Sequence, residues 1–101
     1  MCRIAGIAAQ HLPIHERERW VKSMCDAQWR GGPDDEGVLT PDNASVTLGN
    51  RRLSFNDLSS SGHQPMTYQE RFAITFNGEI YNYKHIKQRL IEAGYTFTGH
   101  S

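Results

Sequence analysis

Cys2 directly follows the initiator methionine, and its type and position suit nucleophilic chemistry. Methionine is normally removed when the second residue is small, which would leave Cys2 carrying both a thiol and a free α-amine. The pKa of a free α-amine is about 7.7–8.0, low enough for it to act as a base near neutral pH. Such a pair can attack a carbonyl carbon and form an acyl-enzyme thioester that water then hydrolyses. The alternative is that Cys2 is an ordinary small residue near a chain end.

Asn77 and Gly78 are candidates for the donors that a developing oxyanion needs. They follow an expected strand at 71–76, and an asparagine side chain and a glycine N–H at a sharp turn can point at one oxygen. Losing one such donor typically costs about 10²–10³ in rate. The same dipeptide is also typical of a tight turn with no chemical role.

Two arginines and one acid are candidates for holding a charged substrate. Arg51 and Arg52 are neighbours in an expected strand, so their side chains point to opposite faces. One of them can then bind a carboxylate in bidentate fashion while the other is solvated. The alternative is that both are solvated. Glu79 can pair with an ammonium group, or simply favour the first turn of a helix.

The elements that must position these residues alternate between strands and helices. The pattern predicts a strand at 3–9, a helix at 14–29 and a loop at 30–37 that is rich in glycine and acids. Further strands are expected in the following ranges: 37–41, 44–49, 51–55, 71–76 and 95–98. A polar stretch at 56–70 interrupts them.

A second helix is expected at 80–93, with Gly94 as its C-terminal cap. Its apolar stripe consists of Tyr83, Ile86, Leu90 and Ile91. This order of elements predicts an α+β layered fold with a mainly antiparallel sheet.

Composition limits the classes of function. The 101 residues suffice for one small domain, and 38% hydrophobic with 22% charged residues suits a globular fold. The formal net charge is +0, which gives no support to nucleic-acid or anionic-membrane binding. No apolar run approaches the roughly 20 residues of a membrane span, and no secretory signal is evident. We therefore expect a cytoplasmic protein that binds neither nucleic acid nor membrane.

The chain has two cysteines, Cys2 and Cys25, which are too few for a zinc site without clustered histidines. A disulfide between them is possible, but nothing indicates an oxidising compartment, so we expect free thiols. The sequence stops directly after the expected strand at 95–98, which favours a piece of a larger domain.

Four segments, taken together, resemble a known family. They are MCRIAGI at 1–7, RGGPDDEG at 30–37, LGNRRLSFNDLSSSGHQPM at 48–66 and FNGEIYNY at 76–83. The chain resembles the N-terminal glutaminase domain of glutamine-hydrolysing asparagine synthetases. That domain is a class II glutamine amidotransferase with the N-terminal-nucleophile hydrolase fold. The resemblance implies an αββα layered α+β fold with antiparallel sheets, truncated here.

The resemblance also implies a role for each candidate residue. Cys2 matches the nucleophile, and Arg52 matches the arginine that holds the α-carboxylate of glutamine. The glutamine-binding loop would consist of Arg52, Leu53, Ser54, Phe55 and Asn56. Asn77 and Gly78 match the oxyanion hole, and Glu79 matches a residue that contacts the substrate. No metal site is implied within residues 1–101.

The reaction that the resemblance implies is hydrolysis of L-glutamine to L-glutamate and ammonia through a Cys2 thioester. A C-terminal synthetase domain, absent here, would use the ammonia and ATP with Mg²⁺ to make asparagine from aspartate. Residues 1–101 would form a partial glutaminase domain that needs no cofactor, and we expect this part to be inactive without the rest of the polypeptide. The alternatives are another class II amidotransferase, in amino-sugar or purine synthesis, or a non-catalytic fragment or binding module. An unpaired sheet edge can also make the chain pair with another copy.

Two residues depart from the family pattern. The family usually has glycine where this chain has Arg3, and it lacks the extra Gly31. An arginine beside the nucleophile can lower the pKa of the thiol or merely face solvent. We interpret both departures as variation within the family.

Overall fold

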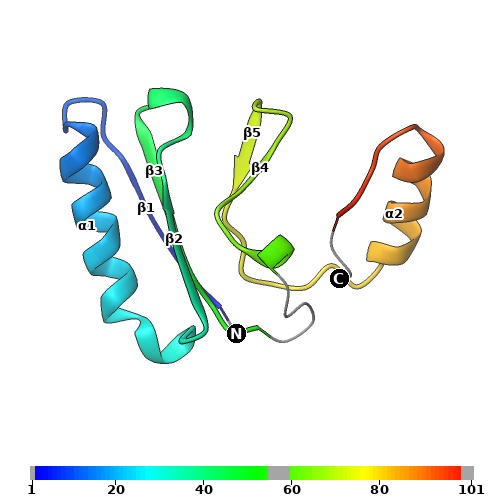
Figure 1. The fold of residues 1–101 in the computed structure, drawn as a ribbon, viewed down its shortest axis with the longest axis horizontal. Coiled ribbons are helices and arrows are strands. Elements are labelled where there is room, and N and C mark those ends of the chain that lie inside the picture. Colours follow the sequence, from blue (N-terminus) through cyan, green and yellow to red (C-terminus); the bar gives the residue numbers. More distant parts are fainter. Residues whose placement is uncertain (1, 55–59, 99–101) are drawn as a thin grey trace.

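The fold is built around a three-stranded antiparallel sheet, as the computed structural model shows for residues 2–54 and 60–98. The strands are β1 (Arg3–Ala8), β2 (Asp35–Leu39) and β3 (Val46–Arg52), in the order β1-β3-β2. Helix α1 (Ile14–Ala27) packs along one face of this sheet (Figure 1). The arrangement places the ends of β1 and β3, and therefore Cys2 and Arg52, side by side.

The core lies between α1 and β3. Val21 and Cys25 project from α1 and are 0% and 1% exposed. They face Gly49, where an added Cβ would lie 2.5 Å from Val21 Cγ1 and 2.7 Å from Cys25 Sγ. Gly49 pairs with Ala5 on one side and with Val38 on the other. A glycine is therefore needed at the centre of the sheet so that the helix can approach it closely.

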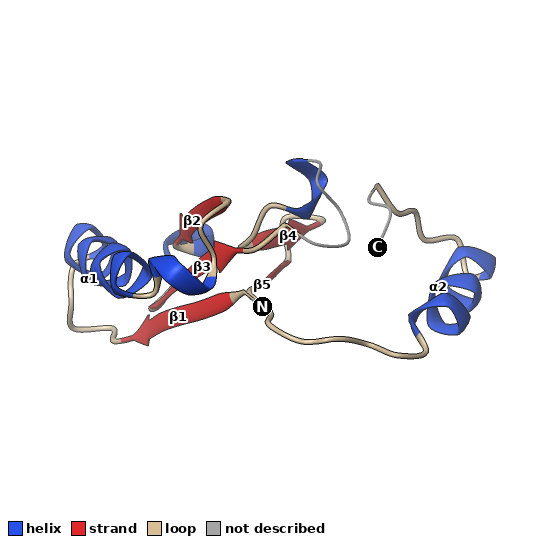
Figure 2. Ribbon diagram, turned by 90° about the horizontal axis from the view of Figure 1, so that it is seen from below, coloured by secondary structure: helices blue, strands red, loops and turns tan. Residues whose placement is uncertain are grey.

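The second half of the chain forms a smaller unit beside the sheet. Its elements are the 3₁₀ helix η3 (Ser60–Gly62), the strands β4 (Met66–Tyr68) and β5 (Phe72–Ile74), and helix α2 (Tyr83–Glu92). The strands β4 and β5 form an antiparallel hairpin, and α2 stands beyond it, away from the three-stranded sheet (Figures 1 and 2). Two further 3₁₀ turns occur in the first half, η1 (Trp29–Gly31) and η2 (Pro41–Asn43).

Several predictions about the elements are confirmed. The strand expected at 3–9 is β1 and the helix expected at 14–29 is α1. The expected strand at 37–41 is present as β2, and the strand at 71–76 as β5. Together these elements confirm an α+β fold with antiparallel sheets.

Other predictions are wrong in their boundaries. The strands expected at 44–49 and 51–55 are one strand, β3, because β1 and β2 flank it and pair with it on both sides of Gly49. The expected loop at 30–37 contains the end of η1 and the start of β2. The polar stretch at 56–70 includes β4, which pairs with β5.

The C-terminal region also departs from the prediction. Helix α2 begins at Tyr83 rather than at residue 80, and the described residues 95–98 form no strand. Gly94 follows the helix with a φ of 97°, which confirms its role as the terminating glycine. The apolar stripe of α2 is not buried, since its four residues are 36–47% exposed.

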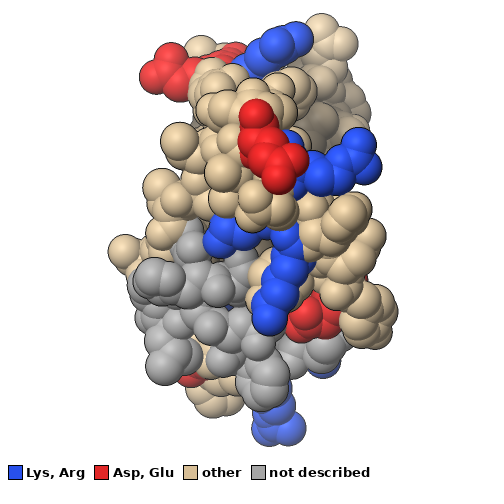
Figure 3. Space-filling model, turned by 90° about the vertical axis from the view of Figure 1, so that its right-hand side faces the viewer, with Lys and Arg blue, Asp and Glu red and all other residues tan. Residues whose placement is uncertain are grey.

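Apolar side chains remain on the surface around α2 and the hairpin. Phe72, Ile74 and Ile80 are each more than half exposed. Figure 3 views this end of the molecule and shows charged residues of both signs between large uncharged areas. Among the described residues, no helix is long and apolar enough to span a membrane.

Candidate active site

Cys2 lies beside the segment that follows β3. Because β1 and β3 are antiparallel with Arg3 opposite Arg51, Cys2 lies opposite Arg52 and beside Leu53. The thiol of Cys2 is within 3.9 Å of the carbonyl oxygen of Leu53, to which it donates a weak hydrogen bond. The structure therefore brings the predicted nucleophile to the predicted glutamine-binding loop.

Arg52 ends β3 and is only 8% exposed. Its guanidinium lies directly against Gly62 of η3, where an added Cβ would overlap Nη2. Leu53 is partly exposed and Ser54 is half-buried. Phe55 and Asn56, the remaining predicted residues of this loop, lie outside the described residues.

The side chain of Arg51 is buried and not solvated. It is 7% exposed, and its Nε donates to the carbonyl oxygen of Gly32 at 2.8 Å. Its Nη1 forms an ion pair with Glu36 Oε2 at 2.8 Å. The prediction that one of the two arginines is solvated is wrong, because both are enclosed by the 30–37 segment and η3.

Three consecutive acids after Pro33 connect to the candidate site, and sequence reasoning assigned them no role. Asp34 joins the predicted glutamine-binding loop twice: its Oδ2 accepts the N–H of Ser54, and its own N–H donates to the carbonyl of Arg52, both at 2.9 Å. Asp35 Oδ2 contacts His63 Nδ1 at 2.6 Å. Glu36 pairs with Arg51. Each of the three acids therefore holds a different segment of the chain. The sequence alone does not indicate these partners.

The Asp35 carboxyl has a lowered pKa. Partial burial raises this pKa, but the hydrogen bond from His63, the N–H of Glu36 and the charges of His63 and Arg52 outweigh that effect. Asp35 is therefore ionised at neutral pH and acts as an acceptor between β2 and the segment before β4.

Asn77, Gly78 and Glu79 lie in the exposed segment between β5 and α2. In both ribbon views this segment leaves β5 near the start of β1 (Figures 1 and 2). The ring of Phe76 packs against Gly78, since an added Cβ there would lie 2.9 Å from Phe76 Cζ. Within the described part of the chain, no hydrogen bond joins Cys2 to Asn77 or Gly78.

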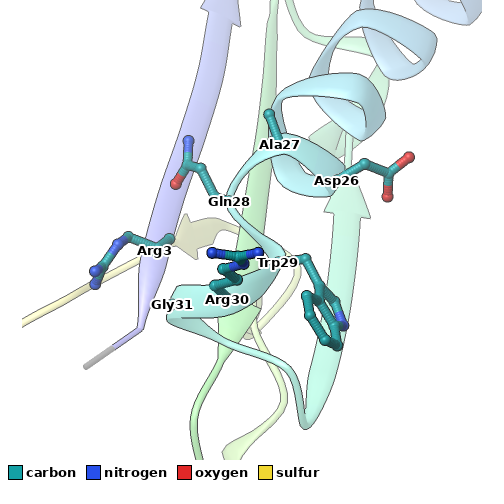
Figure 4. A pocket seen from close by; sticks show the side chains of 7 residues that line it. All are labelled: Arg3, Asp26, Ala27, Gln28, Trp29, Arg30 and Gly31. Atoms are coloured by element: carbon teal, nitrogen blue, oxygen red, sulfur yellow. The ribbon is translucent and has the colours of Figure 1, made fainter.

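An open cavity of about 420 Å³ lies at the C-terminal end of α1, lined by Arg3 and residues 26–31 (Figure 4). Cys2 and Arg52 do not line it, so it is not the predicted glutamine site. Its wall does bring together Arg3 and Gly31, the two residues that depart from the family pattern. An added Cβ at Gly31 would lie 2.6 Å from Cγ and Nε of Arg3, and Arg3 Nη1 donates to the Cys2 carbonyl at 3.0 Å.

The two cysteines are both free, so the possible disulfide between them is not formed. Burial raises the pKa of the Cys25 thiol, and the nearby charge of Glu36 adds to this effect. Cys25 is thus a protonated core residue, whereas Cys2 is half-buried at the candidate site. Across residues 2–54 and 60–98, no group of His, Cys, Asp and Glu side chains is placed to hold a metal ion.

This chain belongs to the glutamine amidotransferase domain family, whose sequence pattern it matches over residues 1–101. Several of its relatives are enzymes named as glutamine-hydrolysing asparagine synthetases. It is 37% identical to asparagine synthetase [glutamine-hydrolyzing] 1 of Bacillus subtilis, over 96% of this chain and 15% of the relative.

A putative asparagine synthetase of Methanocaldococcus jannaschii is 36% identical over 88% of this chain and 20% of its own length. Amidase chry2 of Gibberella zeae is 43% identical over 69% of this chain and 10% of its own length. The chain therefore spans a fifth or less of these relatives. No solved structure matches it significantly, so the N-terminal-nucleophile layered fold stays a prediction.

Proposed function

We propose that this chain is a glutaminase domain of a glutamine-dependent asparagine synthetase, hydrolysing L-glutamine to L-glutamate and ammonia through Cys2. The observation that carries the proposal is the position of the Cys2 thiol, 3.9 Å from the carbonyl of Leu53, in a chain that matches the amidotransferase family throughout. The relatives named for glutamine-hydrolysing asparagine synthesis support the choice of glutamine. The domain would adopt the N-terminal-nucleophile layered fold.

The proposed reaction begins when removal of Met1 frees the α-amine of Cys2. The amine takes the thiol proton, and the sulfur attacks the side-chain amide carbon of glutamine. Asn77 and Gly78 donate to the oxygen that becomes negative in the tetrahedral intermediate. The C–N bond breaks, the amine returns the proton, and ammonia leaves. Water then hydrolyses the thioester, which yields glutamate and regenerates the thiol.

The substrate is held by a charged contact to its α-carboxylate and by further contacts from two segments. The guanidinium of Arg52 binds the α-carboxylate, since its fork of donors matches a carboxylate. Leu53 and Ser54, with Phe55 and Asn56, form the wall of the binding loop. Glu79 contacts the substrate from the segment after the oxyanion donors.

The released ammonia would pass to a synthetase domain that converts aspartate into asparagine. ATP and Mg²⁺ belong to that second step, and no residue of 1–101 is assigned to them. Glutamine hydrolysis would therefore be one of two half-reactions carried out by a longer polypeptide. This is consistent with the chain spanning 15% of the length of the Bacillus subtilis relative.

The test is glutamate release from glutamine by the full-length protein, after removal of Met1 has been verified by N-terminal mass spectrometry. Cys2→Ala should reduce the rate to the uncatalysed background, because no other group supplies the acyl carrier. Cys25→Ala is the matched control and should retain activity, since Cys25 lies in the core with a raised thiol pKa. Activity in Cys2→Ala would contradict the thioester route. Formation of asparagine by the full-length protein separates this function from other amidotransferases.

A further inference from the structure

A set of polar side chains outside the predicted site fastens the segment that carries Asn77 and Gly78. Asn50 lies at the centre of β3 and is 1% exposed. Its Nδ2 donates to Thr75 Oγ1 at 3.0 Å, and the Thr75 hydroxyl donates to the carbonyl of Gly49, also at 3.0 Å. The residue after β5 is thus bound to the central strand, which also carries Arg52.

Gln64 extends this connection by one residue. Its Oε1 accepts the backbone N–H of Phe76 at 2.6 Å and the Nδ2 of Asn50 at 3.3 Å. The ladder with β4 ends at Ile74, so the N–H of Phe76 lies beyond the hairpin. The Gln64 side chain takes the place of a strand partner for this N–H.

The backbone of Gln64 is itself closely held. Its carbonyl lies directly against Gly37 of β2, where an added Cβ would overlap it. Pro65, the next residue, is buried. Gln64, whose side chain reaches Phe76, therefore lies in a connecting segment between η3 and β4 that packs directly against β2.

We infer that Gln64 is a positioning residue for the oxyanion donors: through the N–H of Phe76 it sets the backbone on which Asn77 and Gly78 stand. This inference rests on the proposed glutaminase function. Asn77 and Gly78 are exposed, so packing alone does not fix them. Phe76 is joined to Asn77 by one peptide bond, so a rotation at Phe76 redirects the donors. A small misplacement of catalytic groups can cost about 10²-fold in rate.

Both partners of Gln64 Oε1 are N–H donors, and this determines the choice of variants. Gln64→Met keeps the length of the side chain and removes the acceptor. Gln64→Glu keeps an acceptor that both donors can use. Gln88→Met on the exposed surface of α2 is the matched control.

Kinetics of glutamate release test the role in catalysis. Gln64→Met should lower kcat by about 10- to 100-fold with KM changed less than threefold, because complete removal of one donor typically costs about 10²–10³ in rate and a misplaced donor costs less. Alkylation of Cys2 by iodoacetamide, a displacement at carbon that forms no oxyanion, should keep its rate. Gln64→Glu should recover most of kcat. An unchanged kcat in Gln64→Met would overturn the inference. So would a variant in which kcat falls, KM rises and the rate of Cys2 alkylation falls by similar factors.

Amide hydrogen exchange tests the connection separately from the activity. The amide of Phe76 should exchange at least about tenfold faster in Gln64→Met and return to the parent rate in Gln64→Glu, since exchange reports local opening. If the parent protein releases no glutamate, the proposed function fails whatever the exchange result. If the parent is active and Gln64→Met either fails to fold or leaves Phe76 protected, the positioning role fails alone.

Discussion

Gly31 and Arg3 form a pair whose coupling can be measured. An added Cβ at Gly31 would lie 2.6 Å from Cγ and Nε of Arg3 and 2.7 Å from Cζ, well inside ordinary van der Waals contact, which begins at 3.4 Å. The atoms involved include Cγ, near the base of the side chain, so Gly31→Ala must displace the whole arginine. We therefore expect the variant to break the 3.0 Å hydrogen bond from Arg3 Nη1 to the Cys2 carbonyl.

The size of the coupling follows from two opposing effects. Loss of the hydrogen bond should cost about 0.5–1.5 kcal/mol in the free energy of unfolding. Replacing a glycine by alanine at a compatible position stabilises by about 0.4–1 kcal/mol, because it restricts the unfolded chain. In an Arg3→Ala background only the second effect remains. The effect of Gly31→Ala should therefore differ between the two backgrounds by about 0.5–1.5 kcal/mol.

Urea unfolding of four proteins measures this difference: the parent, each single variant and the double variant. A favourable or neutral effect of Gly31→Ala in the Arg3→Ala background, and a less favourable one in the parent, is the expected result. Equal effects in both backgrounds, within the roughly 0.3–0.5 kcal/mol that independent sites show, would refute the contact as described.

Two further substitutions test contacts made by residues of the three-stranded sheet. Gly49→Ala should lower the free energy of unfolding by about 1–3 kcal/mol, because its Cβ would press on Val21 and Cys25 in the core; unchanged thermal stability would contradict this packing. Asp35→Asn should destabilise the protein at pH 7. The lowered pKa of Asp35 means that its contribution is present above about pH 4 and is lost as the pH falls through the folded-state value. Urea unfolding at pH 7 and at pH 3 should show the two proteins converging at the lower pH, and a constant difference would count against the His63 contact.

The local pattern of the sequence was enough to predict β1 and α1, because hydrophobic periodicity and the break at Pro13 depend on neighbours in the chain. It misplaced the boundaries of β3, since Gly49 interrupts the pattern. In the folded sheet this glycine is kept because α1 needs the space above it. The stripe of α2 was recognised, but its exposure depends on what packs against it, which periodicity does not report.

The candidate site divides in the same way. Cys2 and Arg52 could be named from residue type and motif alone. Asp34 and Gln64 could not, because their partners lie 20 and 12 residues away in the sequence and are backbone N–H groups that every residue but proline has. Only the folded structure shows that Asp34 and Gln64 hold the segments that carry the candidate catalytic and binding residues.

The most direct test of the central claim is the rate of glutamate release by Met1-processed protein carrying Cys2→Ala, compared with the same protein carrying Cys25→Ala. We expect background activity in the Cys2→Ala variant and retained activity in the Cys25→Ala variant. Glutamine hydrolysis that persists without the Cys2 thiol would contradict the central claim.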